Sequence, residues 1–299
     1  MEYRVRHRTT YHYAQPVTHS THLAHLTPRN GDRQTILSHG LTIDPAPSAR
    51  EERWDYFGNR TEWIGLEAVH DTLEIVAESR VRVEPPPLRD PAQSLAWEEL
   101  RARLRHARGA ESLDAIQYMF DSPLTLFTAD LAAYAETSFP AGRPVLAGAI
   151  DLMGRIHRDF RYETGVTDAT TPVDRVFELR AGVCQDLAHI AIACLRSLGL
   201  PARYVSGYLL TEPPPGRQRL LGADASHAWF GVFAPPYGWV DLDPTNDVVV
   251  GDGHVVLGHG RDYGDVAPLA GIILGGQDHR IEVGVDVIPA TDDVRPPGN

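Results

Sequence analysis

The chain has 299 residues, a formal net charge of −12, and 42% hydrophobic and 23% charged residues, the composition of an ordinary globular protein. The acidic balance argues against a nucleic-acid or anionic-membrane partner, since both require a basic face. The N-terminus lacks the apolar core of a signal peptide and no stretch is long enough to span a bilayer, so we expect a cytoplasmic protein.

The first part of the chain predicts an antiparallel β domain over residues 1–84. Alternation of polar and apolar residues indicates strands over 3–13, 18–26, 34–43, 54–57, 61–64 and 71–83, with a hairpin turn at Gly58-Asn59. Five or more strands with no helix between them favour a sandwich or a small barrel.

A run of three prolines, residues 85–87, marks a linker, after which the pattern becomes helical. We expect helices over residues 95–108, 112–121, 129–137, 143–158 and 172–179. These helices form a connector that joins the β domain to a second unit, and connector and unit together occupy residues 85–290. Residues 291–299 are expected to form a flexible tail.

A cysteine stands where a short loop becomes a long apolar helix. Cys184 precedes a run that is apolar almost all round and that Gly199 and Pro201 bring to an end, which predicts a helix buried in a core. The start of a helix favours a thiolate and can receive an oxyanion through its unpaired N–H groups. Cys194 lies about 15 Å further along the same helix, too far for a disulfide, and we expect an inert core thiol there.

Beyond this helix the pattern returns to β structure. We expect strands over residues 203–210, 228–233, 239–242, 272–274 and 280–288. The segment 211–226, rich in proline and glycine, is expected to be a loop that overhangs the cleft and helps to select the substrate.

The hairpin over residues 228–242 places an imidazole and a carboxylate at its open end, because His227 leads into its first strand and Asp243 follows its second. A loop of two or four residues would put the two side chains on opposite faces of the sheet. A three-residue loop, 235–237, or a bulge at Gly238 puts them on one face as diagonal neighbours. We therefore predict an odd offset in this hairpin.

A thiol, an imidazole and a carboxylate together suggest nucleophilic catalysis. The thiolate of Cys184 would attack a carbonyl carbon, His227 would carry protons, and Asp243 would fix the imidazole tautomer. From spacing alone, a buried structural cysteine and an ordinary surface histidine remain open alternatives.

Four segments resemble the transglutaminase-like cysteine enzymes, more narrowly the bacterial proteins that carry an N-terminal β domain. They are residues 180–186 (RAGVCQD), 199–208 (GLPARYVSGY), 226–229 (SHAW) and 239–245 (WVDLDPT). The resemblance covers about residues 149–250, and residues 260–266 fit the bacterial subgroup. Carried over by position, it makes Cys184 the nucleophile, His227 the base and Asp243 the orienting acid.

The resemblance implies an α+β, papain-like core in which the cysteine helix packs on an antiparallel sheet. It also implies acyl transfer from a peptide or isopeptide amide through a thioester at Cys184. We expect hydrolysis, because nothing in the sequence would keep water from a thioester. The alternatives are a protein-glutamine γ-glutamyltransferase and, in another class, an inactive relative used for binding or scaffolding. No cofactor is expected, no loop has the ligand spacing for calcium, and oligomeric state is left open.

Five further residues are candidates for the oxyanion site or the cleft: Tyr162, Gln185, Trp229, Arg261 and Tyr263. Packing is the alternative role for Tyr162 and Gln185. For Arg261 and Tyr263 the alternative is an ordered turn that locks the last strands to the core. A carboxylate as close to Cys184 as Asp186 opposes thiolate formation, so we expect it to face helix N–H groups or Arg180.

Overall fold

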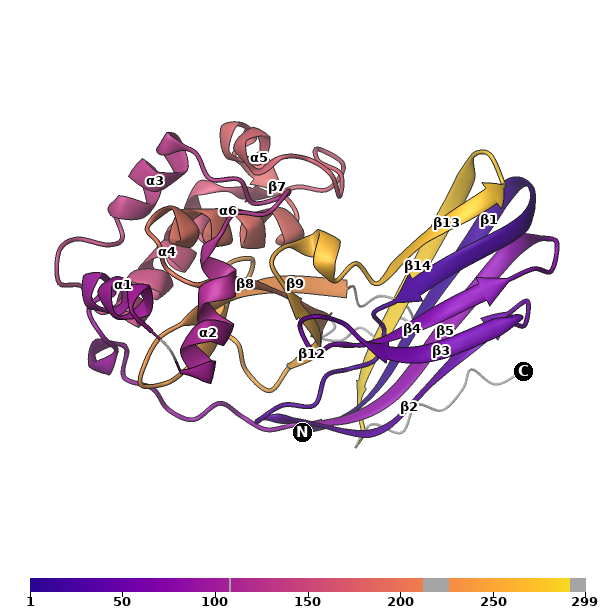
Figure 1. Ribbon diagram of the computed structural model, residues 1–299, viewed down its shortest axis with the longest axis horizontal. Helices are drawn as coiled ribbons and strands as arrows, with labels where there is room; N and C mark the ends of the chain where they lie inside the picture. Colours follow the sequence, from indigo (N-terminus) through magenta and orange to yellow (C-terminus); the bar gives the residue numbers. More distant parts are fainter. Residues whose placement is uncertain (108, 212–225, 291–299) are drawn as a thin grey trace, which may run out of the picture.

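The computed structural model describes residues 1–107, 109–211 and 226–290. A curled β-sheet lies beside a unit of helices packed on a second sheet, as the ribbon in Figure 1 shows. Most of the predicted loop 211–226 and all of the predicted tail 291–299 lie outside the described residues. None of the described helices is long and apolar enough to cross a membrane.

Seven strands form the first sheet, in the order β2-β5-β1-β4-β3 with β13 and β14 also paired to β1. Their bounds are β1 Glu2–Ala24, β2 Gln34–Asp44, β3 Ala49–Trp54, β4 Arg60–Leu66, β5 His70–Val83, β13 Leu269–Gly275 and β14 His279–Pro289. All pairs are antiparallel. Alternate residues of β1 and β5 are buried, as one packed face requires.

The structure differs from the sequence prediction in this sheet at three places. The two runs expected at 3–13 and 18–26 form one 23-residue strand, β1. Residues 55–57 lie in the turn after β3 rather than in a strand. The last two strands, β13 and β14, fall within the range 85–290 but pair with β1 of the N-terminal sheet. The chain therefore returns to the sheet in which it began.

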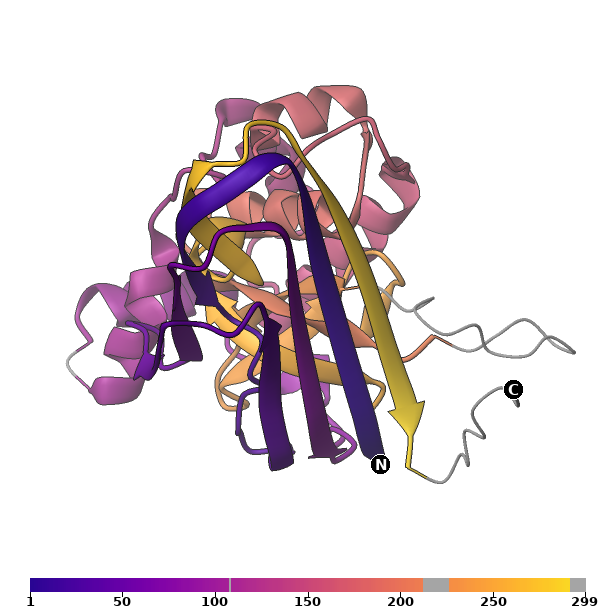
Figure 2. The same cartoon turned by 90° about the vertical axis from the view of Figure 1, so that its right-hand side faces the viewer.

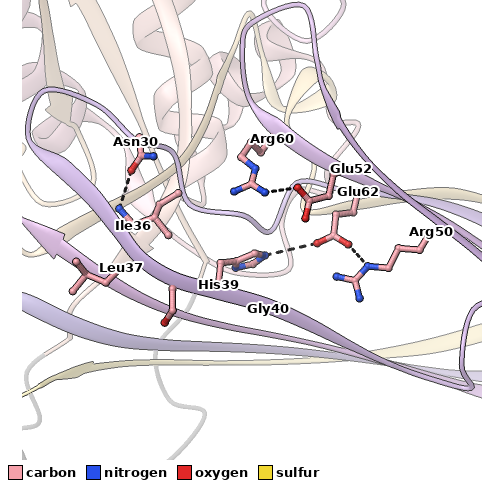
Figure 3. Close-up of a pocket in the computed structure, with 10 residues that line it drawn as sticks. Asn30, Ile36, Leu37, His39, Gly40, Arg50, Glu52, Arg60 and Glu62 are labelled. Carbon is pink, nitrogen blue, oxygen red and sulfur yellow. Dashed lines mark hydrogen bonds and ion pairs between the residues drawn. The ribbon is translucent and has the colours of Figure 1, made fainter.

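The first sheet is strongly curled (Figure 2), and β2 and β3 stand at the two ends of the strand order β2-β5-β1-β4-β3. They line a pocket of about 270 Å³ that is filled by charged groups (Figure 3). In it Glu62 pairs with Arg50 and lies 3.9 Å from His39, while Arg50 Nη1 donates to Leu41 O at 3.1 Å. Side chains rather than backbone hydrogen bonds bridge the gap, so the sheet stops short of a closed barrel.

The second unit contains the helices and the remaining strands. The helices are α1 Trp97–Arg105, α2 Ala110–Ile116, α3 Ala129–Glu136, α4 Val145–Asp159, α5 Val173–Leu179 and α6 Cys184–Ser197, with short 3₁₀ turns η1 Pro91–Gln93, η2 Gln117–Met119 and η3 Tyr263–Asp265. A five-stranded sheet has the order β11-β10-β9-β8-β12, and β6 pairs with β7. The bounds are β6 Arg161–Tyr162, β7 Ala181–Gly182, β8 Ala202–Leu209, β9 Ser226–Phe233, β10 Trp239–Asp243, β11 Val248–Val249 and β12 His254–Gly260.

Helix α6 is the centre of this unit, and its burial confirms the predicted core helix. The apolar residues from Leu187 to Leu195 are at most 2% exposed and pack against β8, β9, α3 and α4. The helix ends as predicted, since Gly199 has φ +72° and Leu200 N donates to Leu195 O at 3.0 Å. Cys194, fully buried, has a pKa raised by burial to about 12, the environment of an unreactive thiol.

Candidate active site

The hairpin formed by β9 and β10 has the predicted odd offset. Ala234 N donates to Gly238 O at 2.8 Å, which leaves the three residues 235–237 as the loop. Trp239 pairs with Phe233 and the register continues without a bulge, which puts Asp243 opposite Trp229. His227 and Asp243 therefore lie on one face as diagonal neighbours.

His227 is in contact with both of the other candidate residues. Its Nε2 lies 2.7 Å from Asp243 Oδ2, and its side chain is 9% exposed. Burial lowers the pKa of His227, but hydrogen bonds with Asp243 and Cys184 outweigh burial and raise the pKa to about 10. The Nε2 atom is occupied by Asp243, so Nδ1 is the ring nitrogen available to Cys184 Sγ. The histidine lies between a sulfur and a carboxylate, and both partners favour its protonated form.

Asp243 is fully buried, yet every part of its carboxylate is hydrogen-bonded. Oδ1 accepts from the backbone N–H groups of Thr245 and Asn246 at 2.9 and 3.3 Å. Oδ2 accepts from Asn246 Nδ2 at 2.7 Å, in addition to the two imidazoles of His227 and His254. Burial alone would raise the pKa of Asp243, but these donors, with His227 first, hold it well below its ordinary value.

Cys184 is the first residue of α6, so its N–H has no carbonyl acceptor within the helix. The preceding turn is held by Asp186, whose Oδ2 accepts from Val183 N at 2.8 Å and from Thr167 Oγ1 at 2.7 Å. A Cβ on Gly182 would lie 2.5 Å from that carboxylate oxygen, which is why glycine is needed there. As expected, Asp186 faces a helix N–H group rather than the thiol.

Two of the further candidates lie at the start of α6. Tyr162, on β6 opposite Gly182, is 58% exposed, and after burial the charge on Cys184 is the cause that raises its pKa. Tyr162 therefore lies near Cys184, with more than half of its surface exposed to solvent. Gln185 Nε2 donates to Ala169 O at 3.2 Å, so its amide is engaged with the neighbouring loop.

The other three candidates are held inside the fold. Trp229 is completely buried behind His227, with the ring centroids 5.9 Å apart. Arg261 forms a two-pronged ion pair with Asp265, at 2.8 and 2.9 Å. Tyr263 N donates to His189 Nε2 at 3.1 Å, which ties η3 to α6. These contacts favour the ordered-turn interpretation of Arg261 and Tyr263, and a supporting position for Trp229.

Three residues near the site were not identified from the sequence: Tyr204, Asn246 and His254. Tyr204 is buried, and after burial the charge on Cys184 is the next cause that raises its pKa well above the ordinary value. Asn246 could have been sought, since the turn residues just after an aspartate often donate backbone N–H groups to its carboxylate. His254 lies on β12, two strands from β9 across β8, and no local pattern joins it to Asp243.

His227, Asp243 and His254 are the one group of His, Cys, Asp and Glu side chains among the described residues that is close enough to hold a metal ion. Both Nε2 atoms point at the same carboxylate oxygen, at 2.7 and 3.2 Å. Ligand atoms about 2.0–2.2 Å from zinc in a tetrahedron would lie about 3.3–3.6 Å from one another. The shorter distance is that of a charge-assisted hydrogen bond, so the group fits a hydrogen-bonded network better than a metal site.

Gly207 on β8 supports this network, because its missing side chain lets the Trp229 ring reach across β8 to His254. A Cβ there would lie 2.2 Å from Val255 O and 2.4 Å from Trp229 Cη2. We expect Gly207→Ala to lower the free energy of unfolding by about 1–3 kcal/mol, measured by urea denaturation. Gly40→Ala, where nothing lies within 4 Å, should change it by less than about 0.5 kcal/mol. Equal urea midpoints for the two variants would contradict the packing argument.

The fold and the site together define a protein with a transglutaminase-like core and a fold similar to that of cysteine proteases. Residues 3–82 match the family described as the bacterial transglutaminase-like N-terminal region, and residues 134–244 match the transglutaminase-like superfamily. An uncharacterized protein of Mycobacterium tuberculosis is 44% identical over 97% of this chain and 94% of its own length. One of Mycobacterium leprae is 34% identical over 95% of this chain and 97% of its own. The chain belongs to this bacterial transglutaminase-like family.

A solved structure and a partial match to a longer relative agree with this assignment. One similar structure is the crystal structure of a protein from Cytophaga hutchinsonii that is provisionally assigned as a cysteine protease. The match covers 99% of this chain and 93% of the Cytophaga chain, with a TM-score of 0.76 and 22% sequence identity. At that identity the likeness shows the fold alone. A protein-glutamine gamma-glutamyltransferase of Pseudomonas aeruginosa is 36% identical over 31% of this chain and 14% of its own length.

Proposed function

We propose that this protein transfers the acyl group of a peptide or protein amide through a thioester at Cys184. His227 acts as the proton carrier and Asp243 orients it. The observation that carries the proposal is the row of hydrogen bonds from sulfur to imidazole to carboxylate, in which the pKa of His227 is raised to about 10. An imidazolium of this kind stabilises a neighbouring thiolate, the reactive form of cysteine.

In the proposed reaction the Cys184 thiolate attacks the amide carbonyl carbon and forms a C–S bond. The imidazolium of His227 gives its proton to the amide nitrogen as the C–N bond breaks, so an amine leaves and a thioester remains. Neutral His227 then takes a proton from water, the oxygen attacks the thioester carbon, and the C–S bond breaks. The carboxylic acid is released, and thiolate and imidazolium are restored.

The oxyanion of each tetrahedral intermediate needs hydrogen-bond donors. We assign the backbone N–H of Cys184 to this role, because it stands at the first position of α6 and the dipole of the helix favours negative charge there. The Gln185 amide would have to leave Ala169 O to serve as a second donor.

Water is the acceptor that the site favours. Cys184 is only half-buried and the neighbouring Tyr162 is 58% exposed, so solvent can reach a thioester at this position. The second candidate activity, γ-glutamyl transfer to an amine, is supported by the partial likeness to the Pseudomonas aeruginosa transferase. An inactive binding relative is less well supported, because the three reactive side chains are intact and in contact.

A glutamine-containing peptide with and without a primary amine separates these activities. We expect ammonia or a cleaved backbone at similar rates in both reactions, with Cys184→Ala as the blank. Mass spectrometry distinguishes a deamidated peptide, a peptide cleaved in its backbone and an amine adduct. An amine adduct as the main product would replace hydrolysis with γ-glutamyl transfer, and a rate equal to the blank for a broad peptide library would favour the inactive relative.

A further inference from the structure

His254 makes a contact that the proposed chemistry has not used. It opens strand β12, and its Nε2 lies 3.2 Å from Asp243 Oδ2 with only 6% of the residue exposed. Two elements therefore hold the carboxylate. His227 and Asn246 belong to the β9–β10 hairpin and the turn that follows it, whereas His254 comes from the far side of β8.

The surroundings of the ring fix which nitrogen carries the proton. Nδ1 of His254 is buried and has no hydrogen-bond partner among the described residues. The ring meets Trp229 edge-on, with centroids 5.1 Å apart and planes at 82°. Because Asp243 offers only acceptor atoms in its charged form, the proton of a neutral His254 must lie on Nε2. His254 is thus a donor to the same oxygen that His227 uses.

We infer that His254 is a positioning residue for Asp243, an inference that rests on the proposed function of Cys184 and His227. A carboxylate held only by its own hairpin could turn about its last bond. The donor from β12 fixes Oδ2 from a second direction, so that the oxygen stays aimed at His227 Nε2. It also adds a third side-chain donor to Oδ2, which favours the charged form of the buried acid.

Two substitutions separate this hydrogen bond from mere packing. His254→Gln keeps an amide N–H near the place of Nε2, whereas His254→Phe keeps the ring and removes the donor. We expect His254→Phe to lower kcat about 10- to 100-fold with KM unchanged, the usual effect of removing a partner that orients a reactive group. His254→Gln should retain kcat within about threefold of wild type. His254→Asn, whose amide stops short of Asp243, replaces the Phe variant if that one does not fold.

A second readout needs no substrate. In an NMR titration of the ring protons, the pKa of His227 should fall by at least about one unit in His254→Phe and stay near its wild-type value in His254→Gln. If neither wild type nor any variant cleaves an amide, the proposed function is refuted, and the titration alone decides whether His254 positions Asp243. Equal kcat values and equal His227 titrations in His254→Phe and His254→Gln would overturn the positioning role of His254. Loss of wild-type activity after EDTA treatment would also overturn it, since His254 would then act as a metal ligand.

Discussion

Alanine in place of Cys184 is expected to lower the rate of amide cleavage by roughly 10⁴-fold or more. No other group can form the thioester, and the remaining residues would only bind and polarise the amide. Steady-state kinetics on the peptide that wild type turns over best provide the measurement. The fold should persist, because Cys184 is the first residue of α6 and is only partly buried.

Alkylation tests the same residue without a substrate. At pH 6 an ordinary cysteine is about 0.3% thiolate, the form that iodoacetamide attacks. The proposed proton carrier His227 would speed this reaction at Cys184, because a protonated imidazole beside a thiol favours the attacking form. We expect iodoacetamide to modify Cys184 at pH 6 at least about tenfold faster than a cysteine in an unfolded peptide. His227→Ala should remove most of this difference.

The second cysteine of α6 is the matched control for both measurements. Cys194 is fully buried, with a pKa raised by burial to about 12, and should stay unmodified in the folded protein. Cys194→Ala should retain the cleavage rate and the fast alkylation. Modification of Cys184 at the rate of a free cysteine, or unchanged cleavage in Cys184→Ala, would refute the activated nucleophile.

Local patterns in the sequence were enough to predict the parts of the site that depend on neighbouring residues. The start and end of α6 follow from Cys184, Gly199 and an apolar run between them, all within one helix. The hairpin offset follows from counting residues between two strands that are adjacent in the chain. In both cases the residues that decide the geometry are close in sequence, so periodicity and turn chemistry contain the answer.

The missed features depend on pairs of residues far apart in the chain. Strand β1 pairs with β14 at the other end of the chain, from Tyr3–Pro289 to Tyr13–His279, and alternation within either segment does not name a partner. His254 meets Asp243 because β12 pairs with β8, where Gly207 leaves room for the backbone of β12 and for the Trp229 ring. The glycine was a usable signal, since glycine inside a strand often marks a close approach. The strand that approaches this glycine could not be identified from the sequence.

Asparagine in place of Asp243 is expected to lower kcat by about 10³- to 10⁴-fold, as loss of the orienting carboxylate does in related triads. The amide would keep the shape of the side chain but cannot accept from His227, His254 and Asn246 as a charged group. Asp241→Asn is the matched control. Asp241 lies two residues earlier on the same strand, pairs with Arg203 at 3.3 Å, and makes no contact with His227 in the described structure, so its variant should retain kcat.

The pH dependence of stability gives Asp243→Asn a second signature. The folded pKa of His227, about 10, lies above the ordinary value of 6.5, so the pairing stabilises the fold fully below pH 6.5 and is lost as pH rises towards 10. Asp243 has a lowered pKa, so its contribution to the free energy of unfolding is present above about pH 4. Urea unfolding should therefore show the largest deficit of Asp243→Asn relative to wild type near pH 5–6.5, and a smaller one at pH 10. A deficit that is constant from pH 6 to 10 would mean that His227 is not held as an imidazolium by Asp243, and the proposed proton carrier would lose its physical basis.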